Sequence, residues 1–271
     1  MKRIIDFPKM ANSNDKIVML TAYDYPSAKL AEEQNVDMIL VGDSLGMVVL
    51  GYDSTIEVTV ADMIHHGKAV RRGAPNTFVI VDMPFGSYHG DRYDVLKTAV
   101  DIFQQTGANA LKVEGVGTTL PTIKLMIEAG IPVMGHLGLQ PQQAANMGGY
   151  KVQGRTEEGV QKLIDEVHQL QDVGVFAIVF ECIPTEVMTQ LQAILTVPSI
   201  GIGAGPTADG QVLVYHDVLA YGSHHIAKFV KQFSNIGKEA AKGIQLYKDA
   251  VKTGDFPAEI HSFHLKKEAG K

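Results

Sequence analysis

Acidic residues recur in this chain at the ends of short apolar runs. The runs are rich in β-branched residues, and the polar residues that end them are Asp24, Asp43, Asp82, Glu114, His136, Glu181 and Asp217. In a parallel α/β protein, the carboxyl ends of the strands form one face, on which the connecting loops build the active site. We therefore expect these side chains to converge, although any one of them could simply mark where a strand ends and polar sequence begins.

Three of these carboxylates form a set of hard oxygen ligands. Asp43, Asp82 and Glu114 come from three different runs, and no paired-cysteine or His-Glu-x-x-His motif offers softer ligands. Mg²⁺ prefers oxygen ligands, takes few protein carboxylates and keeps positions for water and substrate. The set predicts a magnesium site, although three strand-end acids could also cap loops.

Lys112 and Glu114 are two residues apart in the run "ALKVEG". On a strand, both side chains point to the same face. A charged pair that faces a barrel interior is unfavourable unless it meets counter-charges or a metal. We expect the pair to belong to a site, and the alternative is a structural salt bridge.

Glu181 ends the very apolar run in "VFECIP". A carboxylate among such neighbours is expected to be partly desolvated with a raised pKa, which suits a general base. The alternative is an ordinary strand-end acid bonded to backbone amides. The adjacent Cys182 should face the other way and pack as a small core residue. His136, in "GHLGLQPQ", is a candidate neutral donor to a substrate oxygen, or else a packed histidine.

The stretch "GDSLG" at residues 42–46 matches the Gly-Asp-Ser-Leu signature of a family of serine esterases. A serine hydrolase needs a histidine base oriented by an acid, and these esterases carry Asp-x-x-His near the C-terminus and a Gly-x-Asn-Asp block. This chain lacks the block, and its Asp-x-x-His pairs lie in helical patterns far from the C-terminus: Asp62/His65 and Asp165/His168. We expect Ser44 to be a hydrogen-bond donor and Asp43 to carry the function of the motif.

Eight apolar runs, too short for most helices, are typical of buried parallel strands. They span residues 16–24, 37–44, 77–84, 109–115, 131–138, 176–182, 197–205 and 211–217. Between them, helical spacing covers residues 25–35, 92–107, 118–130 and 156–174, and several of these segments end in Gly. The alternation predicts a (β/α)8 TIM barrel in preference to an open doubly wound sheet. Because no proline- or serine-rich linker divides the 271 residues, we expect one domain over residues 1–271.

The composition narrows the class of partner. The net charge is -6, which gives no reason to expect nucleic acid or an anionic membrane surface. No run approaches about 18 apolar residues, and the N-terminus has no apolar signal core. A single cysteine excludes an intrachain disulfide. We expect a cytoplasmic enzyme or binding protein whose partners are small molecules or copies of itself.

With these residues in hand, the chain resembles the ketopantoate hydroxymethyltransferase (3-methyl-2-oxobutanoate hydroxymethyltransferase) family over nearly its whole length. The resemblance rests on ordered blocks that include "DMILVGDSLGMVVLGYDSTIEVT", "VDMPFGSY", "ALKVEG", "IPVMGHLGLQPQ", "GGYKVQGR", "VFECIP" and "DGQVLVYHD". Two stretches depart from it. Gln140 stands where other members tend to have threonine, and "LAYGSHHIAKFV" differs from the commoner form after the last strand.

The resemblance implies a (β/α)8 barrel of the phosphoenolpyruvate/pyruvate type with one Mg²⁺ per subunit. It implies that Asp43, Asp82 and, directly or through water, Glu114 hold the metal, and that Glu181 is the base. The residues implied to contact the ketoacid are Asp43, Ser44, Asp82, Lys112 and His136. The implied reaction transfers a hydroxymethyl group from 5,10-methylenetetrahydrofolate to 3-methyl-2-oxobutanoate through a magnesium-stabilised enolate, giving 2-dehydropantoate for pantothenate and coenzyme A synthesis. The family also implies a homodecamer.

Two rival classes remain open. A carbon-carbon lyase of the isocitrate-lyase type would also use Mg²⁺ and a ketoacid, but its usual cysteine loop is missing here. A non-catalytic ketoacid-binding protein would not need Glu181, so proton exchange at the ketoacid separates it from an enzyme. No stretch carries a clear pterin signature. The loop at residues 146–154 is either a lid or a plain connection.

Overall fold

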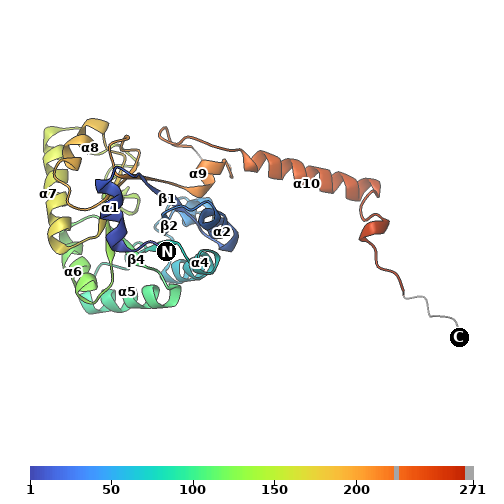
Figure 1. Cartoon of the computed structure of the whole chain (residues 1–271), viewed down its shortest axis with the longest axis horizontal. Coiled ribbons are helices and arrows are strands. Elements are labelled where there is room, and N and C mark those ends of the chain that lie inside the picture. Colours follow the sequence, from blue (N-terminus) through green and yellow to red (C-terminus); the bar gives the residue numbers. More distant parts are fainter. Residues whose placement is uncertain (223–225, 266–271) are drawn as a thin grey trace.

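The computed structural model describes residues 1–222 and 226–265 (Figure 1). Part of the segment "LAYGSHHIAKFV" therefore lies outside the described residues. Eight parallel strands pair in sequence order and close into a barrel, because β8 pairs with β1. The strands are β1 Ile17–Thr21, β2 Met38–Val41, β3 Phe78–Asp82, β4 Ala110–Glu114, β5 Val133–Gly138, β6 Ala177–Glu181, β7 Ser199–Ile202 and β8 Gly210–Leu213.

Helices α4 to α8 follow one another around the outside of the strands (Figure 1). The α-helices are α1 Phe7–Asn12, α2 Tyr25–Glu33, α3 Leu45–Val48, α4 Val60–Gly73, α5 Arg92–Thr106, α6 Leu120–Glu128, α7 Glu157–Val173, α8 Thr185–Gln192, α9 Tyr215–Leu219 and α10 Ile236–Thr253. Four 3-10 turns are η1 Ile4–Asp6, η2 Gly117–Thr119, η3 Pro141–Gln143 and η4 Glu259–His261. The predicted (β/α)8 barrel is confirmed, and the four predicted helices are present.

The N-terminal end of the barrel is closed by α1. Phe7 and Met10 of this helix join the apolar cluster that fills the barrel interior, which includes Met38 and Met134. The ring of Phe7 meets that of Phe78 edge to face, with centroids 5.0 Å apart. A small ligand can therefore reach the interior only from the opposite end, where the strands finish.

Two predicted strand-end acids occupy other positions. The last predicted strand is too long, since β8 ends at Leu213 and Asp217 lies in α9. Asp24 is the N-cap of α2, where its side chain accepts a hydrogen bond from the Ser27 amide. A carboxylate at this position stabilises the helix start, so Asp24 has the structural role.

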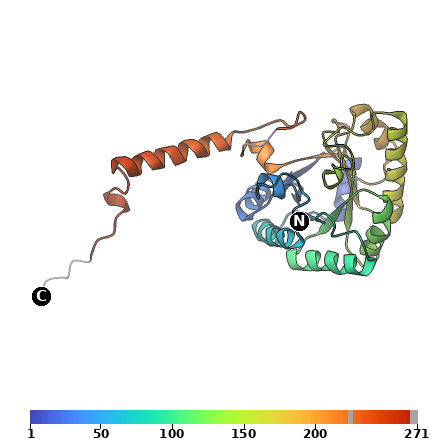
Figure 2. The ribbon, with the colours of Figure 1, turned by 180° about the vertical axis from the view of Figure 1, so that it is seen from behind.

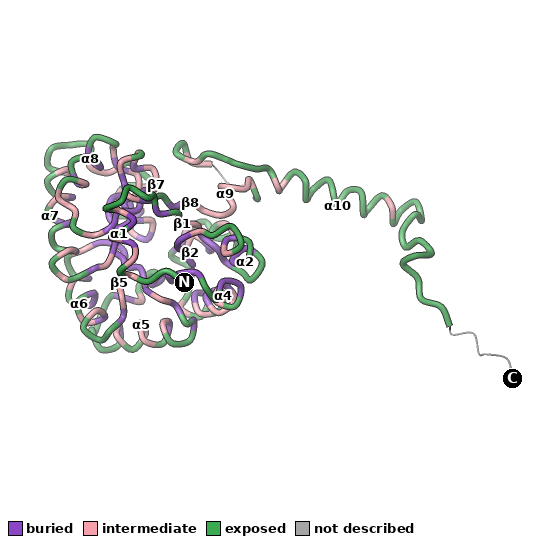
Figure 3. The backbone as a smooth tube through the Cα atoms, viewed as in Figure 1, coloured by how far each residue is buried: buried purple, intermediate pink, exposed green. Residues whose placement is uncertain are grey.

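The C-terminal arm leaves the barrel. Helix α10 extends away from it in both views (Figures 1 and 2), and none of its residues is buried (Figure 3). Among the described residues, no helix links β7 to β8, and Val18, on the outside of β1, is 52% exposed. No described helix is both long and apolar enough to cross a membrane.

Candidate active site

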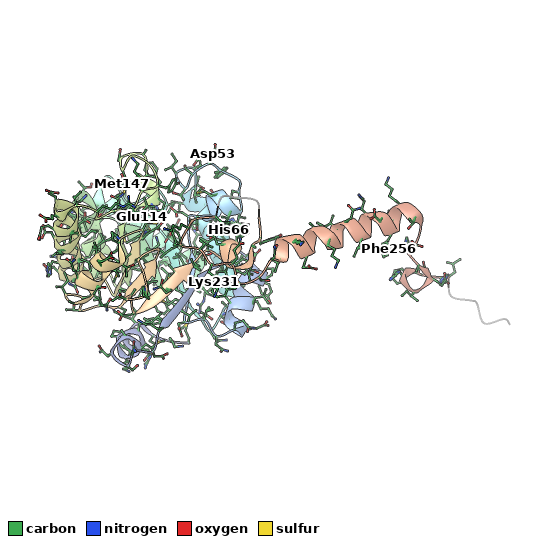
Figure 4. All side chains as sticks on the ribbon, turned by 90° about the horizontal axis from the view of Figure 1, so that it is seen from above. Asp53, His66, Glu114, Met147, Lys231 and Phe256 are labelled. Carbon is green, nitrogen blue, oxygen red and sulfur yellow. The ribbon has the colours of Figure 1, made fainter. Side chains whose placement is uncertain are left out.

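A cavity of about 180 Å³ opens at the carboxyl end of the barrel. Figure 4 shows Glu114 inside the barrel and Phe256 far away at the end of the arm. The predicted site residues that line the cavity are Asp43, Ser44, Asp82, Lys112, Glu114, His136 and Glu181. Seven residues from five strands or the turns after them thus meet at one place, as expected from parallel strands.

A buried lysine lies at the centre of the charged network. Lys112 on β4 is in register with Asp82 on β3, and its Nζ lies 3.1 Å from Asp82 Oδ1. Burial alone would lower the pKa of Lys112, but the charges of Asp82, Glu114 and Asp43 outweigh burial and raise it. Lys112 is therefore a fixed cation. The salt bridge exists, but it belongs to a larger cluster, so the purely structural alternative does not describe it.

Asp43 and Asp82 carry more negative charge than their surroundings compensate. Both are nearly inaccessible, and burial raises the pKa of each carboxyl. Their mutual repulsion and that of Glu114 raise the pKa of Asp43 further. The Asp43 amide donates to Asp82 Oδ2 over 3.1 Å, whereas Asp82 Oδ1 has no hydrogen-bond partner among the described residues besides its ion pair with Lys112. The pair therefore presents negative charge and an acceptor oxygen to a cation.

His136 lies between two carboxylates. Its Nδ1 is 3.4 Å from Glu114 Oε1, and its Nε2 is 3.2 Å from Glu181 Oε2. Burial and Lys112 lower the pKa of His136, but the two carboxylates outweigh them and raise it to about 9. The sequence predicts either a neutral donor to a substrate oxygen or a packed histidine, and the structure places the ring in the cavity wall, where both roles are available. Lys112 Nζ also lies 3.3 Å from His136 Nδ1, so one cationic and two acidic side chains surround the ring.

Glu181 is the most accessible carboxylate of the cluster. Its side chain is 16% exposed, whereas those of Asp82 and Glu114 are 3% and 2% exposed. Its side chain pairs with His136, not with backbone amides as one alternative expected. The neighbouring Cys182 is half-buried, and burial followed by the charge of Glu181 raises its thiol pKa to about 12. The cysteine is therefore no nucleophile at neutral pH.

Gln142 is a residue of the site that sequence reasoning missed. It lies in η3 after β5, and its Nε2 donates to Asp43 Oδ2 over 2.7 Å and to Met83 O over 3.0 Å. Its backbone amide donates to Glu114 Oε2 over 3.1 Å, and Tyr88 donates to its Oε1 over 2.6 Å. One buried residue thus holds two of the candidate metal ligands, Asp43 through its side-chain amide and Glu114 through its backbone amide. The available signal was a polar "QPQ" turn directly after a strand that carries a site histidine.

The esterase interpretation of "GDSLG" has no support in the structure. The hydroxyl of Ser44 lies 2.8 Å from that of Tyr23, a tyrosine and not the histidine base that a serine hydrolase needs. Gly46 is required for close packing, because a Cβ there would lie 2.6 Å from Val58 Cγ2. Asp62, from one of the Asp-x-x-His pairs, belongs to the capping box at the start of α4, where its carboxylate accepts from the amide and the hydroxyl of Thr59. The motif therefore forms one wall of the charged cavity.

The donor set fits a magnesium ion. Mg²⁺ usually takes one or two protein carboxylates and completes its shell with water and substrate oxygens. Among the described residues, no three His, Cys, Asp or Glu side chains already converge as ligands of one ion. An ion held directly by Asp43 and Asp82, with Glu114 reaching it through water, agrees with the small number of carboxylates that Mg²⁺ usually takes and with the absence of a preformed three-ligand group in the part of the chain that the structure describes. Three buried carboxylates beside one lysine also leave negative charge for a divalent cation to neutralise.

Solved structures with a similar fold include two enzymes. One is 2,3-dimethylmalate lyase, described as a member of the PEP mutase/isocitrate lyase superfamily, with a TM-score of 0.61, 16% identity, and coverage of 94% of this chain and 86% of that one. Another is phosphonopyruvate hydrolase in complex with oxalate and Mg²⁺, with a TM-score of 0.62, 14% identity, and coverage of 96% and 93%. At these identities the likeness shows the fold alone.

Sequence comparison is more specific. A curated relative from Lysinibacillus sphaericus (strain C3-41), named 3-methyl-2-oxobutanoate hydroxymethyltransferase, is 62% identical over 269 residues, which cover 99% of this chain and 96% of the relative. The family model described as ketopantoate hydroxymethyltransferase matches residues 2–259. A match of this extent, on a chain whose strand-end acids form one buried cluster, shows that the chain is an enzyme of the ketopantoate hydroxymethyltransferase family.

Proposed function

We propose that this chain transfers a hydroxymethyl group from 5,10-methylenetetrahydrofolate to 3-methyl-2-oxobutanoate, giving 2-dehydropantoate for pantothenate and coenzyme A synthesis. Its curated relatives carry the name of this activity. The observation that carries the proposal is the position of Glu181, which is accessible at the edge of a cavity whose floor holds Lys112 among buried carboxylates. The buried charges on the floor suit an anionic ketoacid bound together with a cation. The accessible carboxylate at the edge suits a general base.

Glu181 accepts the proton from C3 of the ketoacid. The contact between its Oε2 and His136 Nε2 holds the carboxylate in one orientation. The electron pair of the broken C–H bond moves into the ketone, which gives an enolate, and C3 then forms a bond to the one-carbon unit. Both carbon-nitrogen bonds of the methylene bridge break, and water supplies the hydroxyl oxygen. Proton removal is costly in water at about 1.4 kcal/mol per unit of pKa mismatch, so charge stabilisation must reduce this gap.

Lys112 supplies a fixed positive charge beside the ketoacid, where the low dielectric of a buried site makes it effective. We propose that one Mg²⁺ per subunit is held by Asp43 and Asp82, with Glu114 contacting it directly or through water. When bound, the ion would polarise the ketone as a Lewis acid. The residues proposed to contact the ketoacid are Asp43, Ser44, Asp82, Lys112 and His136.

Deuterium exchange tests the base. In D₂O with Mg²⁺ and without folate, NMR should show exchange of the C3 hydrogen of 3-methyl-2-oxobutanoate, because enolisation does not need the donor. Glu181→Gln should abolish the exchange while calorimetry still detects ketoacid binding. Glu186→Gln, at an exposed position on α8, is the matched control. Unchanged exchange in Glu181→Gln would contradict the assignment.

Product formation tests the reaction class. Adding methylenetetrahydrofolate to the same sample should give 2-dehydropantoate. Exchange without product would instead support another ketoacid enzyme, and binding without exchange would support the non-catalytic alternative. Calorimetry with Mg²⁺ should show that Asp82→Asn weakens metal and ketoacid binding together, and intact binding of both would remove Asp82 from the site.

We propose that the chain forms a homo-oligomer, a decamer by analogy with its family, and that α10 packs on a second copy. Its apolar stripe includes Ile244, Tyr247 and Val251, which are 69%, 62% and 46% exposed. The start of the helix is anchored beside α9, since the Gly237 amide donates to Ala220 O, and the helix extends away from its own barrel (Figure 2). The uncovered wall at β1 and β8 is the complementary surface. Sedimentation velocity of the full chain should show an oligomer, and a monomer at micromolar concentration would contradict this proposal.

We propose that the barrel and arm together form one functional domain over residues 1–271. We also propose that the protein works in the cytoplasm on small anionic metabolites, with no nucleic-acid or membrane partner. The net charge of -6 supports this choice of partners. Fractionation of cells that express the tagged chain tests the location, and recovery in the membrane fraction would contradict it.

A further inference from the structure

The cavity has a charged floor and an apolar rim. The floor holds the lysine and the carboxylates, whereas the rim is lined by Met47, Tyr150 and Phe229. Tyr150 is 55% exposed, and Met47 and Phe229 are each 37% exposed. Three large apolar side chains from distant segments thus surround one opening while keeping much of their surface free.

The volume of the cavity indicates that the two proposed substrates bind in different places. Sites that enclose drug-sized ligands usually measure roughly 300–1,000 Å³, whereas this cavity measures about 180 Å³. It suits a small branched ketoacid but not a folate as well. Since α1 and the interior cluster close the other end of the barrel, the one-carbon donor must approach through the rim.

The rim side chains are held in place. Tyr150 Oη lies 4.0 Å from Met47 Sδ across the opening. The Phe229 ring lies against Gly203, where a Cβ would be 2.8 Å from Phe229 Cδ1 and where φ is +63°. Burial, followed by the charges of Asp43, Glu181 and Glu114, raises the pKa of Tyr150. Tyr150 lines the same cavity as Glu181.

A buried hydroxyl without a partner lies on the same wall. Thr55 follows α3, the helix that carries Met47, and lines the cavity at 2% exposure. Its Oγ1 has no hydrogen-bond partner among the described residues. Buried polar groups are rarely left unsatisfied in native proteins, so this hydroxyl points to a polar ligand.

We propose that this rim, formed by Met47, Thr55, Tyr150 and Phe229, is the donor subsite and binds the planar, pyrimidine-containing ring of a reduced folate. Aromatic side chains stack on flat heterocycles, thioether sulfur contacts ring edges favourably, and Thr55 bonds a polar edge of the ring. The proposal rests on the proposed function, because it names the site of the second substrate.

Calorimetric titration with tetrahydrofolate, in the presence of Mg²⁺ and ketoacid, tests the subsite. Tyr150→Ala and Phe229→Ala should each weaken tetrahydrofolate binding about tenfold, as expected for loss of one stacking contact, and raise the KM for methylenetetrahydrofolate similarly. Ketoacid affinity measured separately should fall much less. Tyr93→Ala on α5, which is 63% exposed, is the matched control.

Conservative variants exclude a general loss of structure. Tyr150→Phe should retain tetrahydrofolate affinity within about twofold, because stacking does not need the hydroxyl. Thr55→Val should weaken it about fivefold, as for one hydrogen bond, and Thr55→Ser should restore it. Unchanged tetrahydrofolate affinity in Tyr150→Ala and Phe229→Ala, in an enzyme that still forms 2-dehydropantoate, would overturn the subsite alone. Absence of product from the unmodified enzyme would instead overturn the proposed function.

Discussion

The half of the barrel from β2 to β6 differs from the half formed by β7, β8 and β1. The first half supplies the buried ionisable side chains of the cavity and its most accessible carboxylate: Asp43, Asp82, Lys112, Glu114, His136 and Glu181. The second half lines the cavity mainly with apolar side chains: Ile202, Val212 and Leu213. Its only other polar contributions to the described lining are Thr21 and Asp217.

The two halves also differ outside the strands. Helices α4 to α8 cover the first half, whereas among the described residues β7 and β8 are joined without a helix and Val18 of β1 is half-exposed. Buried charges interact strongly only where water is excluded and neighbours are fixed. The half from β2 to β6 therefore holds its charged side chains in fixed positions away from water. The half formed by β7, β8 and β1 has less helical cover and offers a surface for contact with another chain.

The largest expected effect comes from removing the buried cation. Lys112→Met should lower the free energy of unfolding by about 3–5 kcal/mol, because it leaves buried carboxylates without their counter-charge. Urea unfolding monitored by circular dichroism measures this change. Lys162→Met, which removes an exposed lysine that pairs with Glu166, should cost less than about 1 kcal/mol. Equal losses in the two variants would remove the distinction between interior and exterior charge.

A smaller effect is expected from Gln142→Leu. The variant loses the amide that holds Asp43, although its backbone bond to Glu114 remains. Residues that orient metal ligands typically contribute about 10–100-fold to metal affinity, so calorimetry should show Mg²⁺ binding weakened to that extent. Tyr88→Phe should have a weaker effect, because it acts only through Gln142. Gln143→Leu is the control, and unchanged Mg²⁺ affinity in Gln142→Leu would assign the amide a purely structural role.

The proposed packing of α10 on the half formed by β7, β8 and β1 of a second copy can be tested with variants of α10. Ile244→Glu on the apolar stripe of α10 should shift the oligomer toward smaller species in sedimentation velocity, because a charge at a packed interface is costly. Its effect on the unfolding of the isolated subunit should stay within about 0.5 kcal/mol, as for an exposed site. Lys242→Glu, a charge-altering change on the opposite face of the same helix, is the control. An unchanged assembly in Ile244→Glu would show that α10 packs on nothing.

The smallest effect concerns a buried carboxylate outside the cavity. Glu166 on α7 is 7% exposed, and burial raises its pKa above the ordinary value of 4.5 despite Lys162. Because the folded state binds this proton more tightly than the unfolded state, ionised Glu166 disfavours folding above its folded pKa. That cost disappears as the pH falls below about 4.5.

Glu166→Gln should therefore raise the free energy of unfolding at pH 7 by about 0.5 kcal/mol, within the usual range for a single substitution. The gain should vanish near pH 4, which thermal unfolding at both pH values measures. Glu158→Gln, at an exposed position earlier in α7, serves as the control. A gain that persists at pH 4 would show that ionisation is not its cause.

Much of the barrel could be predicted because its signals are local. Short apolar runs alternate with amphipathic segments, and an apolar run ends where its backbone leaves the sheet. Asp82 and Glu114 are therefore the last residues of β3 and β4, as predicted. Asp24 and Asp217 gave the same local signal and were misassigned, because a helix cap and a short helix also place an acid after a strand.

The partners of the site residues could not be predicted in the same way. His136 has an ordinary sequence context, and its charge depends on Glu114 and Glu181, which reach it from two other strands. Gln142 lies in a turn whose sequence resembles any polar loop, and only the closed barrel brings it to Asp43, 99 residues away in sequence. Pair contacts of this kind follow from strand order and register, which no single segment encodes.

Local sequence patterns predict the eight strands and place Asp82, Glu114 and Glu181 at the ends of three of them, so acids are expected to collect at one end of a parallel barrel. These features can be predicted because strand periodicity and chain reversal depend on neighbouring residues. Three features follow from the closed barrel instead: Lys112 is enclosed by three carboxylates, His136 lies between Glu114 and Glu181, and α10 leaves the barrel. These outcomes depend on burial and on distances across the closed barrel, and both exist only once all eight strands have paired.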